Sequence, residues 1–68
     1  MGRDKARDDK FVNCSQESEL VYISSLYERS FDVLIFLRRE CNYGNLKYST
    51  HREVYDLISR KLGYPMPN

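Results

Sequence analysis

Apolar residues between positions 15 and 28 recur at helical spacing. Leu20, Ile23 and Tyr27 are three and four residues apart, with polar residues between them, so one face of a helix would carry all three. Residues 13–16 (Asn-Cys-Ser-Gln) offer an N-cap with Gln at the third helical position, which is a reciprocal capping arrangement. The pattern predicts an amphipathic helix over about residues 15–28.

A second apolar run, residues 33–37, is hydrophobic on every side and suits an element that lies between two others. Periodicity over five residues does not separate a buried helix from a buried strand. We favour a helix over about residues 30–42, because residues 28–30 (Glu-Arg-Ser) make a poor hairpin turn and no breaker follows the run. Ser30 can cap this helix, and Gly44 can end it in the left-handed conformation.

The third pattern has clear signals at both ends. Thr50 and Glu53 have the spacing of a capping box, and Gly63 follows a basic last turn. Gly63 is suited to the left-handed residue that ends a helix. The apolar face consists of Val54, Leu57, Ile58 and Leu62. These features predict a helix over about residues 50–62.

The three segments together predict an all-α domain, a small three-helix bundle over residues 11–68. Residues 1–10 hold mainly charges of mixed sign and predict a flexible tail, because so few apolar groups cannot offset the entropy of ordering the backbone. A chain of 68 residues can form one domain with a thin core. Such domains gain stability from close helix packing or from a partner.

A second topology stays open at this point, in which residues 16–42 form one long helix. No Gly or Pro interrupts this part of the chain. Apolar residues at heptad spacing within it are Leu20, Tyr27, Leu34 and Cys41. Such a helix would expose apolar side chains unless two copies paired. The alternative fold is therefore a long-helix hairpin that forms a homodimer.

Features that bear on the compartment are few. The chain has no apolar stretch of membrane-spanning length, and its first residues carry charges without the apolar region of a secretory signal. Two cysteines, Cys14 and Cys41, are too few for a disulfide framework, so we expect both to remain thiols in a reducing compartment. These observations predict a cytoplasmic protein.

Groups suited to catalysis or metal binding are also few. The two cysteines are 27 residues apart and His51 follows the second by 10, which matches none of the short paired spacings of structural zinc sites. The three glycines are isolated, so the sequence contains no glycine-rich phosphate loop. We therefore expect no enzyme activity, no catalytic residues, no cofactor and no metal. We expect His51, at the start of the third helix, to face solvent.

Tyrosine is abundant, with six residues, and tryptophan is absent. Tyrosine offers a large amphipathic contact area at low entropy cost and is enriched at protein interfaces. The connection after the second helix carries three large side chains, which either fold over the core or meet a partner. The leading hypothesis is a small non-catalytic protein-binding module, which is an adaptor, inhibitor or regulator. Its predicted partner-binding residues are Tyr43, Leu46, Tyr48 and Tyr55.

Charge is polarised along the chain, although the net charge is only +1. Residues 11–36 contain one basic and four acidic residues, whereas residues 37–68 contain six basic and three acidic ones. The alternative hypothesis is a DNA-binding or DNA-associated transcriptional regulator that uses this basic half. Its predicted nucleic-acid contacts are Arg38, Arg39, Lys47, His51, Arg52, Arg60 and Lys61. Basic residues near helix ends also balance helix dipoles without any partner.

The basic half also resembles a known family. Residues 30–62 are predicted as a helix, an extended loop and a second helix, with Tyr48 and Thr50 before residues 53–55 (Glu-Val-Tyr). This order is similar to the helix–extended loop–helix modules of SAP and LEM type. The resemblance implies binding to DNA or to a small DNA-bridging protein. It covers about half the chain, and the loop lacks the paired glycines usual in that family.

Overall fold

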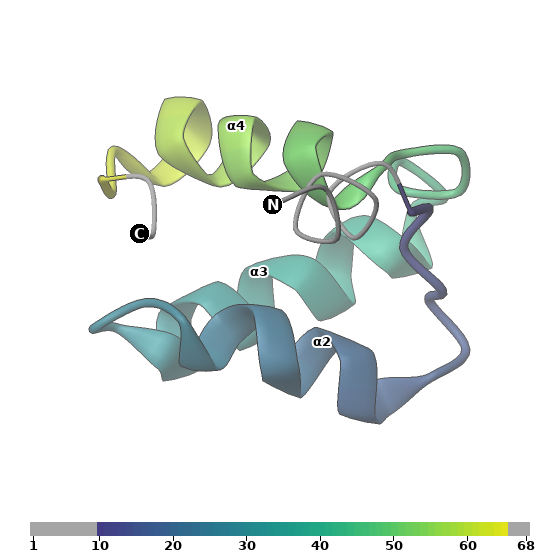
Figure 1. Ribbon diagram of the computed structural model, residues 1–68, viewed down its shortest axis with the longest axis horizontal. Helices are drawn as coiled ribbons and strands as arrows, with labels where there is room; N and C mark the ends of the chain where they lie inside the picture. Colours follow the sequence, from purple (N-terminus) through teal and green to yellow (C-terminus); the bar gives the residue numbers. More distant parts are fainter. Residues whose placement is uncertain (1–9, 66–68) are drawn as a thin grey trace, which may run out of the picture.

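The computed structural model describes residues 10–65 and contains three helices in that range (Figure 1). They are α2 (Glu17–Ser25), α3 (Ser30–Asn42) and α4 (His51–Leu62). The predicted all-α class and three-helix architecture are confirmed. Within the described residues no strand is present beyond an isolated antiparallel bridge between Phe11 and Thr50. The predicted flexible tail lies outside the described residues, apart from Lys10.

A turn over residues 26–29 separates α2 from α3, so the continuous-helix alternative is wrong. The α2 helix ends at Ser25, three residues before the predicted end. The hydroxyls of Ser24 and Ser25 donate to the carbonyl oxygens of Val21 and Tyr22, at 2.8 and 2.6 Å. Such serine bonds compete with the helical backbone pattern, which favours an early end.

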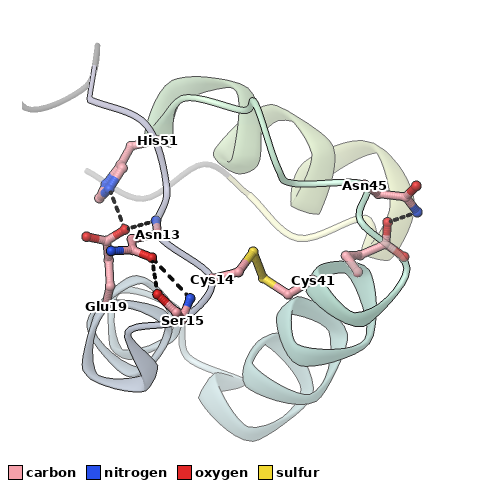
Figure 2. The surroundings of a disulfide bond; sticks show 8 residues. Asn13, Cys14, Ser15, Glu19, Cys41, Asn45 and His51 are labelled. Carbon is pink, nitrogen blue, oxygen red and sulfur yellow. Dashed lines mark hydrogen bonds and ion pairs between the residues drawn. A yellow bond between two sulfur atoms is a disulfide. The ribbon is translucent and has the colours of Figure 1, made fainter.

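No side-chain cap forms at the observed start of either α2 or α3, although Asn13 Oδ1, ahead of α2, accepts the Ser15 amide at 3.1 Å (Figure 2). Gln16 and Arg29 are the N-cap residues of α2 and α3, and neither has a side-chain capping bond. Ser30 is instead the first helical residue of α3. At the start of α2, the Asn13 amide donates to a carboxylate oxygen of Glu19, six residues along the chain rather than three. This spacing is outside the usual capping pattern, which explains why sequence reasoning missed it.

The core joins all three helices and both connecting segments. Its buried residues are Val12, Leu20, Ile23, Tyr27, Val33, Leu37, Leu46, Val54 and Ile58. Full burial of an aliphatic side chain contributes about 1.5–3 kcal/mol, so even this short list accounts for most of the stabilising free energy of a small domain. Burial, together with a smaller contribution from the nearby Tyr55, raises the pKa of Tyr27 to about 12.

The apolar run in α3 is only partly enclosed. Val33 and Leu37 are fully buried, and Leu34 and Phe36 are half-buried at the sides of the helix. Ile35, in the middle of the run, is 52% exposed. The prediction of an enclosed helix is therefore wrong for its outer face, because α2 and α4 cover only the opposite side of α3.

Residues 10–16 run beside the connection between α3 and α4 before α2 begins (Figure 1). The Val12 amide donates to the Ser49 carbonyl oxygen at 2.8 Å, and the His51 amide donates to the Lys10 carbonyl oxygen at 2.9 Å. These bonds join the N-terminal segment to the start of α4. Residues far apart in the sequence therefore form one edge of the domain.

A disulfide joins Cys14 to Cys41, with 5.7 Å between the two Cα atoms (Figure 2). This corrects the prediction that both cysteines are thiols. The two residues are 27 positions apart, and no local pattern pairs them. They meet because α2 and α3 are antiparallel, which places the segment before α2 next to the last turn of α3. No helix within residues 10–65 is long and apolar enough to cross a membrane.

Candidate protein-docking surface

The connection between α3 and α4, residues 43–50, begins with a hydrogen-bonded helix end. Gly44 has φ +78°, as predicted for the residue that ends α3. Its amide donates to the Cys41 carbonyl oxygen, and the Asn45 amide donates to that of Glu40, both at 3.0 Å. This pair of bonds is the Schellman arrangement, which satisfies two of the free carbonyl groups at a helix end. The Asn45 side chain also donates to the Glu40 carboxylate at 2.9 Å (Figure 2).

Leu46 attaches this connection to the core. Its side chain is fully buried, and backbone bonds join Lys47 to Gly44 and Ser49 to Leu46 on either side of it. The prediction of Leu46 as a partner-binding residue is therefore corrected, because a fully buried side chain offers no contact area. Its burial fixes the positions of the neighbouring residues instead.

Tyr43 and Tyr48 point away from the core on either side of Leu46. Their side chains are 69% and 78% exposed, which is high for large aromatic residues in a connection held this firmly. The Lys47 ammonium group lies 5.6 Å from the centre of the Tyr48 ring, within cation–π range. Of the three large side chains in this connection, Leu46 packs into the core, whereas Tyr43 and Tyr48 are exposed.

Tyr55, the fourth predicted partner-binding residue, belongs to a different environment. It is half-buried and packs against the core. The His51 ring lies edge-on to it, with 6.4 Å between ring centres and 89° between planes. Tyr55 therefore lies beside the buried His51. Of the predicted partner-binding tyrosines, Tyr43 and Tyr48 are the two that are mostly exposed.

An open groove beside Tyr48 runs between the connection and α4. Its charged lining residues are Glu40, Arg52, Glu53, Asp56, Arg60 and Lys61. Three of these are basic and three are acidic, so the lining has no net charge. Arg60 and Asp56 form an ion pair at 3.1 Å, one helical turn apart. A groove of mixed charge is typical of the polar rim of a protein interface.

The predicted nucleic-acid contacts are spread over three elements. Arg38 donates to the Glu17 carboxylate of α2 through Nε at 2.8 Å, and Arg60 pairs with Asp56 on α4. Arg39, Arg52 and Lys61 are exposed. Two of these cations, Arg38 and Arg60, therefore pair with carboxylates of the same chain.

His51 is buried, with 4% exposure, which corrects the prediction that it faces solvent and reaches nucleic-acid bases. Its Nε2 atom lies 3.5 Å from Glu19 Oε1, the oxygen that also accepts the Asn13 amide (Figure 2). The start of α4 is covered because residues 10–13 pass over it, a long-range contact without a sequence signal. Glu19 thus connects α2, the N-terminal segment and α4, and sequence reasoning gave it no role.

Within residues 10–65 there is no group of three His, Cys, Asp or Glu side chains arranged to hold a metal ion. The disulfide occupies both cysteine sulfur atoms. Comparison with family models, curated proteins and solved structures found no match to this chain. Functional inference therefore rests on its own residues.

Proposed function

We propose that this protein is a small non-catalytic protein-binding module, an adaptor, inhibitor or regulator, that docks through residues 43–50. The observation that carries the proposal is the pair of exposed rings, Tyr43 and Tyr48, on a connection attached to the core by Leu46. Tyrosine and arginine are enriched at the energetic centres of interfaces. Arg52, in the adjacent groove, supplies the second of these residue types.

The rigidity of the connection supports this proposal. Binding costs about 0.5–1.5 kcal/mol for each side chain that must be ordered, and more when a loop must also be ordered. Here the Schellman bonds and buried Leu46 hold the backbone before any partner arrives. A partner with two apolar pockets and a rim of mixed charge would therefore meet a surface already in its bound shape.

Nucleic acid remains the alternative partner from the sequence, and the observed charges favour protein. A groove with equal numbers of acidic and basic residues would repel phosphates as strongly as it attracts them. The two partner classes differ in salt dependence. Phosphate contacts weaken steeply as salt rises, whereas an interface centred on tyrosines changes little.

The test is affinity capture from extract of the cells that express the protein, with a nuclease-treated half and an untreated half. The double variant Tyr43→Ala/Tyr48→Ala should lose the captured protein. Tyr22→Ala is the matched control, because Tyr22 is another exposed tyrosine, on α2 and outside the connection. Capture that survives the double variant, or that disappears with nuclease treatment, would overturn the proposal.

The proposal includes no catalytic role, since the buried His51 lies beside a carboxylate and no free thiol.

The disulfide also bears on the predicted cytoplasmic location. Disulfides persist in oxidising compartments, whereas the cytoplasm keeps most thiols reduced. The bond therefore favours an oxidising environment over the predicted one. Alkylation of cysteines in intact cells, followed by mass measurement, distinguishes the two: an oxidised pair resists alkylation, and a reduced pair gains two labels.

A further inference from the structure

The outer face of α3 carries exposed apolar residues that neither the core nor the docking surface uses. Phe31 is 80% exposed and Ile35 is 52% exposed, one helical turn apart on the same face. Large apolar side chains grouped in this way mark an interaction surface more often than single exposed ones do. The other exposed α3 residues on this face are Asp32, Arg38, Arg39 and Asn42.

The charges on this face follow a definite order. Asp32 lies in the first turn of α3, and Arg39 lies in the last turn, next to Arg38. Ile35 is central: Asp32 and Arg38 are each three residues from it, and Phe31 and Arg39 are each four. At 100° per residue, Asp32 and Arg39 lie on one side of Ile35, whereas Phe31 and Arg38 lie on the other. A two-fold axis beside Ile35 keeps each side against the same side of the copy, so an identical antiparallel helix presents Arg39 opposite Asp32. The face is complementary to itself.

We infer that the outer face of α3 is a homodimer interface, in which a second copy of this chain packs α3 against α3 antiparallel about a two-fold axis at Ile35. The two Ile35 side chains meet at the axis. Phe31 lies against the aliphatic stem and guanidinium group of Arg38 of the partner subunit, a pairing suited to cation–π and stacking contacts. Such an interface is closed, because the same patch serves both copies.

A neighbouring residue of α2 widens the same surface. The ion pair between Glu17 and Arg38 shows that the Glu17 side of α2 borders the outer face of α3. Val21, one turn after Glu17, is 44% exposed on that side. The apolar area therefore extends from Phe31 and Ile35 onto α2 and is flanked by an ion pair.

Self-association explains this charge order better than a different partner does. A two-fold antiparallel interface brings each end of the helix against the opposite end of its copy, so opposite charges at similar distances from its centre are paired. Antiparallel helices also place opposite dipole ends together. A helix of 13 residues is about 20 Å long, so the contact is at the small end of interface sizes and we expect a reversible dimer.

The dimer leaves the docking surface accessible. Residues 43–50 follow the C-terminal end of α3, and antiparallel packing places the two C-terminal ends at opposite ends of the dimer. Two docking surfaces on one particle would raise the avidity for a repeated partner. The dimer itself does not depend on the proposed docking function.

Sedimentation velocity across a wide concentration range tests the inference on the whole chain. The wild-type protein should shift from monomer towards dimer as concentration rises. Ile35→Glu should raise the dissociation constant by about 100-fold or more, because two carboxylates would face each other at the axis. Both Ile35 and Phe31 are exposed in one copy, so circular dichroism should show an unchanged fold.

A charge-reversal pair provides the matched control. Arg39→Glu places an acidic group opposite Asp32 of the partner subunit and should weaken the dimer, whereas Arg52→Glu makes the same charge change on α4 and should not. A protein that stays monomeric at the highest concentration overturns the inference. So does a dimer that resists Ile35→Glu but dissociates in Tyr43→Ala/Tyr48→Ala, which would place self-association on the docking surface instead.

Discussion

The two ends of this small domain are organised by different kinds of interaction. Near the C-terminus, α4 has a complete capping box at Thr50 and Glu53 and a left-handed Gly63 at its end. Near the N-terminus, α2 has no side-chain cap at Gln16, and its surroundings are held by contacts from distant parts of the chain. One helix thus has its ends defined by adjacent residues, whereas the other depends on its tertiary neighbours.

The long-range contacts of the N-terminal region have three components. The disulfide joins it to the end of α3, the Val12–Ser49 backbone bond joins it to the connection before α4, and Glu19 lies beside His51. All of these require the bundle to be assembled first. In this small fold, local caps fix the ends of α4, and long-range bonds fix the start of α2, which has no side-chain cap.

Removal of the disulfide should have the largest effect on stability. Closing a loop between residues 27 positions apart contributes about 3–4 kcal/mol in the chain-entropy account. The double variant Cys14→Ser/Cys41→Ser should therefore lose about that much unfolding free energy in urea titrations. Hydrogen exchange should accelerate most in residues 10–25 and least in α4. Equal acceleration in both regions would show that the N-terminal region depends on the disulfide no more than α4 does.

A reductant provides the control for this prediction. It should destabilise the wild-type protein to the level of the double variant and leave the variant itself unchanged. A wild-type protein whose urea midpoint does not respond to reductant would show that the bond adds nothing to stability.

Truncation of Glu19 should have the next largest effect. Its carboxylate accepts the Asn13 amide and lies 3.5 Å from His51 Nε2, and a bond to a charged group contributes about 1.5–3 kcal/mol. Glu19→Ala should therefore cost about 2 kcal/mol, against about 1 kcal/mol for Thr50→Ala at the local cap of α4. Thermal or urea unfolding measures both.

The control for this pair is Glu28→Ala, which removes an exposed carboxylate from the turn after α2 and should change the unfolding free energy by less than about 0.5 kcal/mol. If Glu19→Ala costs no more than Glu28→Ala, the tertiary role of Glu19 is refuted.

Tyr27→Phe should have the smallest effect, and it should depend on pH. Among the described residues the Tyr27 hydroxyl is buried without a hydrogen-bond partner, so its removal at pH 7 should leave stability unchanged or slightly raised. Burial raises the pKa of Tyr27 from its ordinary 10.0 to about 12. The folded state therefore favours the neutral hydroxyl, and its contribution is complete below pH 10 and disappears as pH rises to 12.

Urea midpoints at pH 8 and at about pH 11, within the range where an ordinary tyrosine is ionised, measure this difference. The wild-type protein should lose more stability between the two conditions than Tyr27→Phe does. Equal losses would show that Tyr27 ionises as readily in the folded chain as in the unfolded one.

Much of the fold could be predicted from the chain alone. The helical class, the ends of α4 and the left-handed Gly44 follow from signals within a few residues of each other. The exposed tyrosines of the candidate site were also predicted as side chains of a connecting segment. Leu46 was assigned to the same surface but is fully buried, because sequence does not reveal which side of a connection packs against the core. Tyr55 is half-buried on α4, so its partner-binding role stays a prediction.

The helical class and the ends of α4 follow from the sequence, because apolar spacing and caps act between neighbouring residues; the break between α2 and α3 did not, since one long helix was also open. The packing of the helices fixes three further features: Cys14 meets Cys41, His51 is buried beside Glu19, and the outer face of α3 is exposed. These outcomes depend on how the antiparallel helices bring distant residues together. No local pattern encodes such distances, because each arises from the packing of the whole chain.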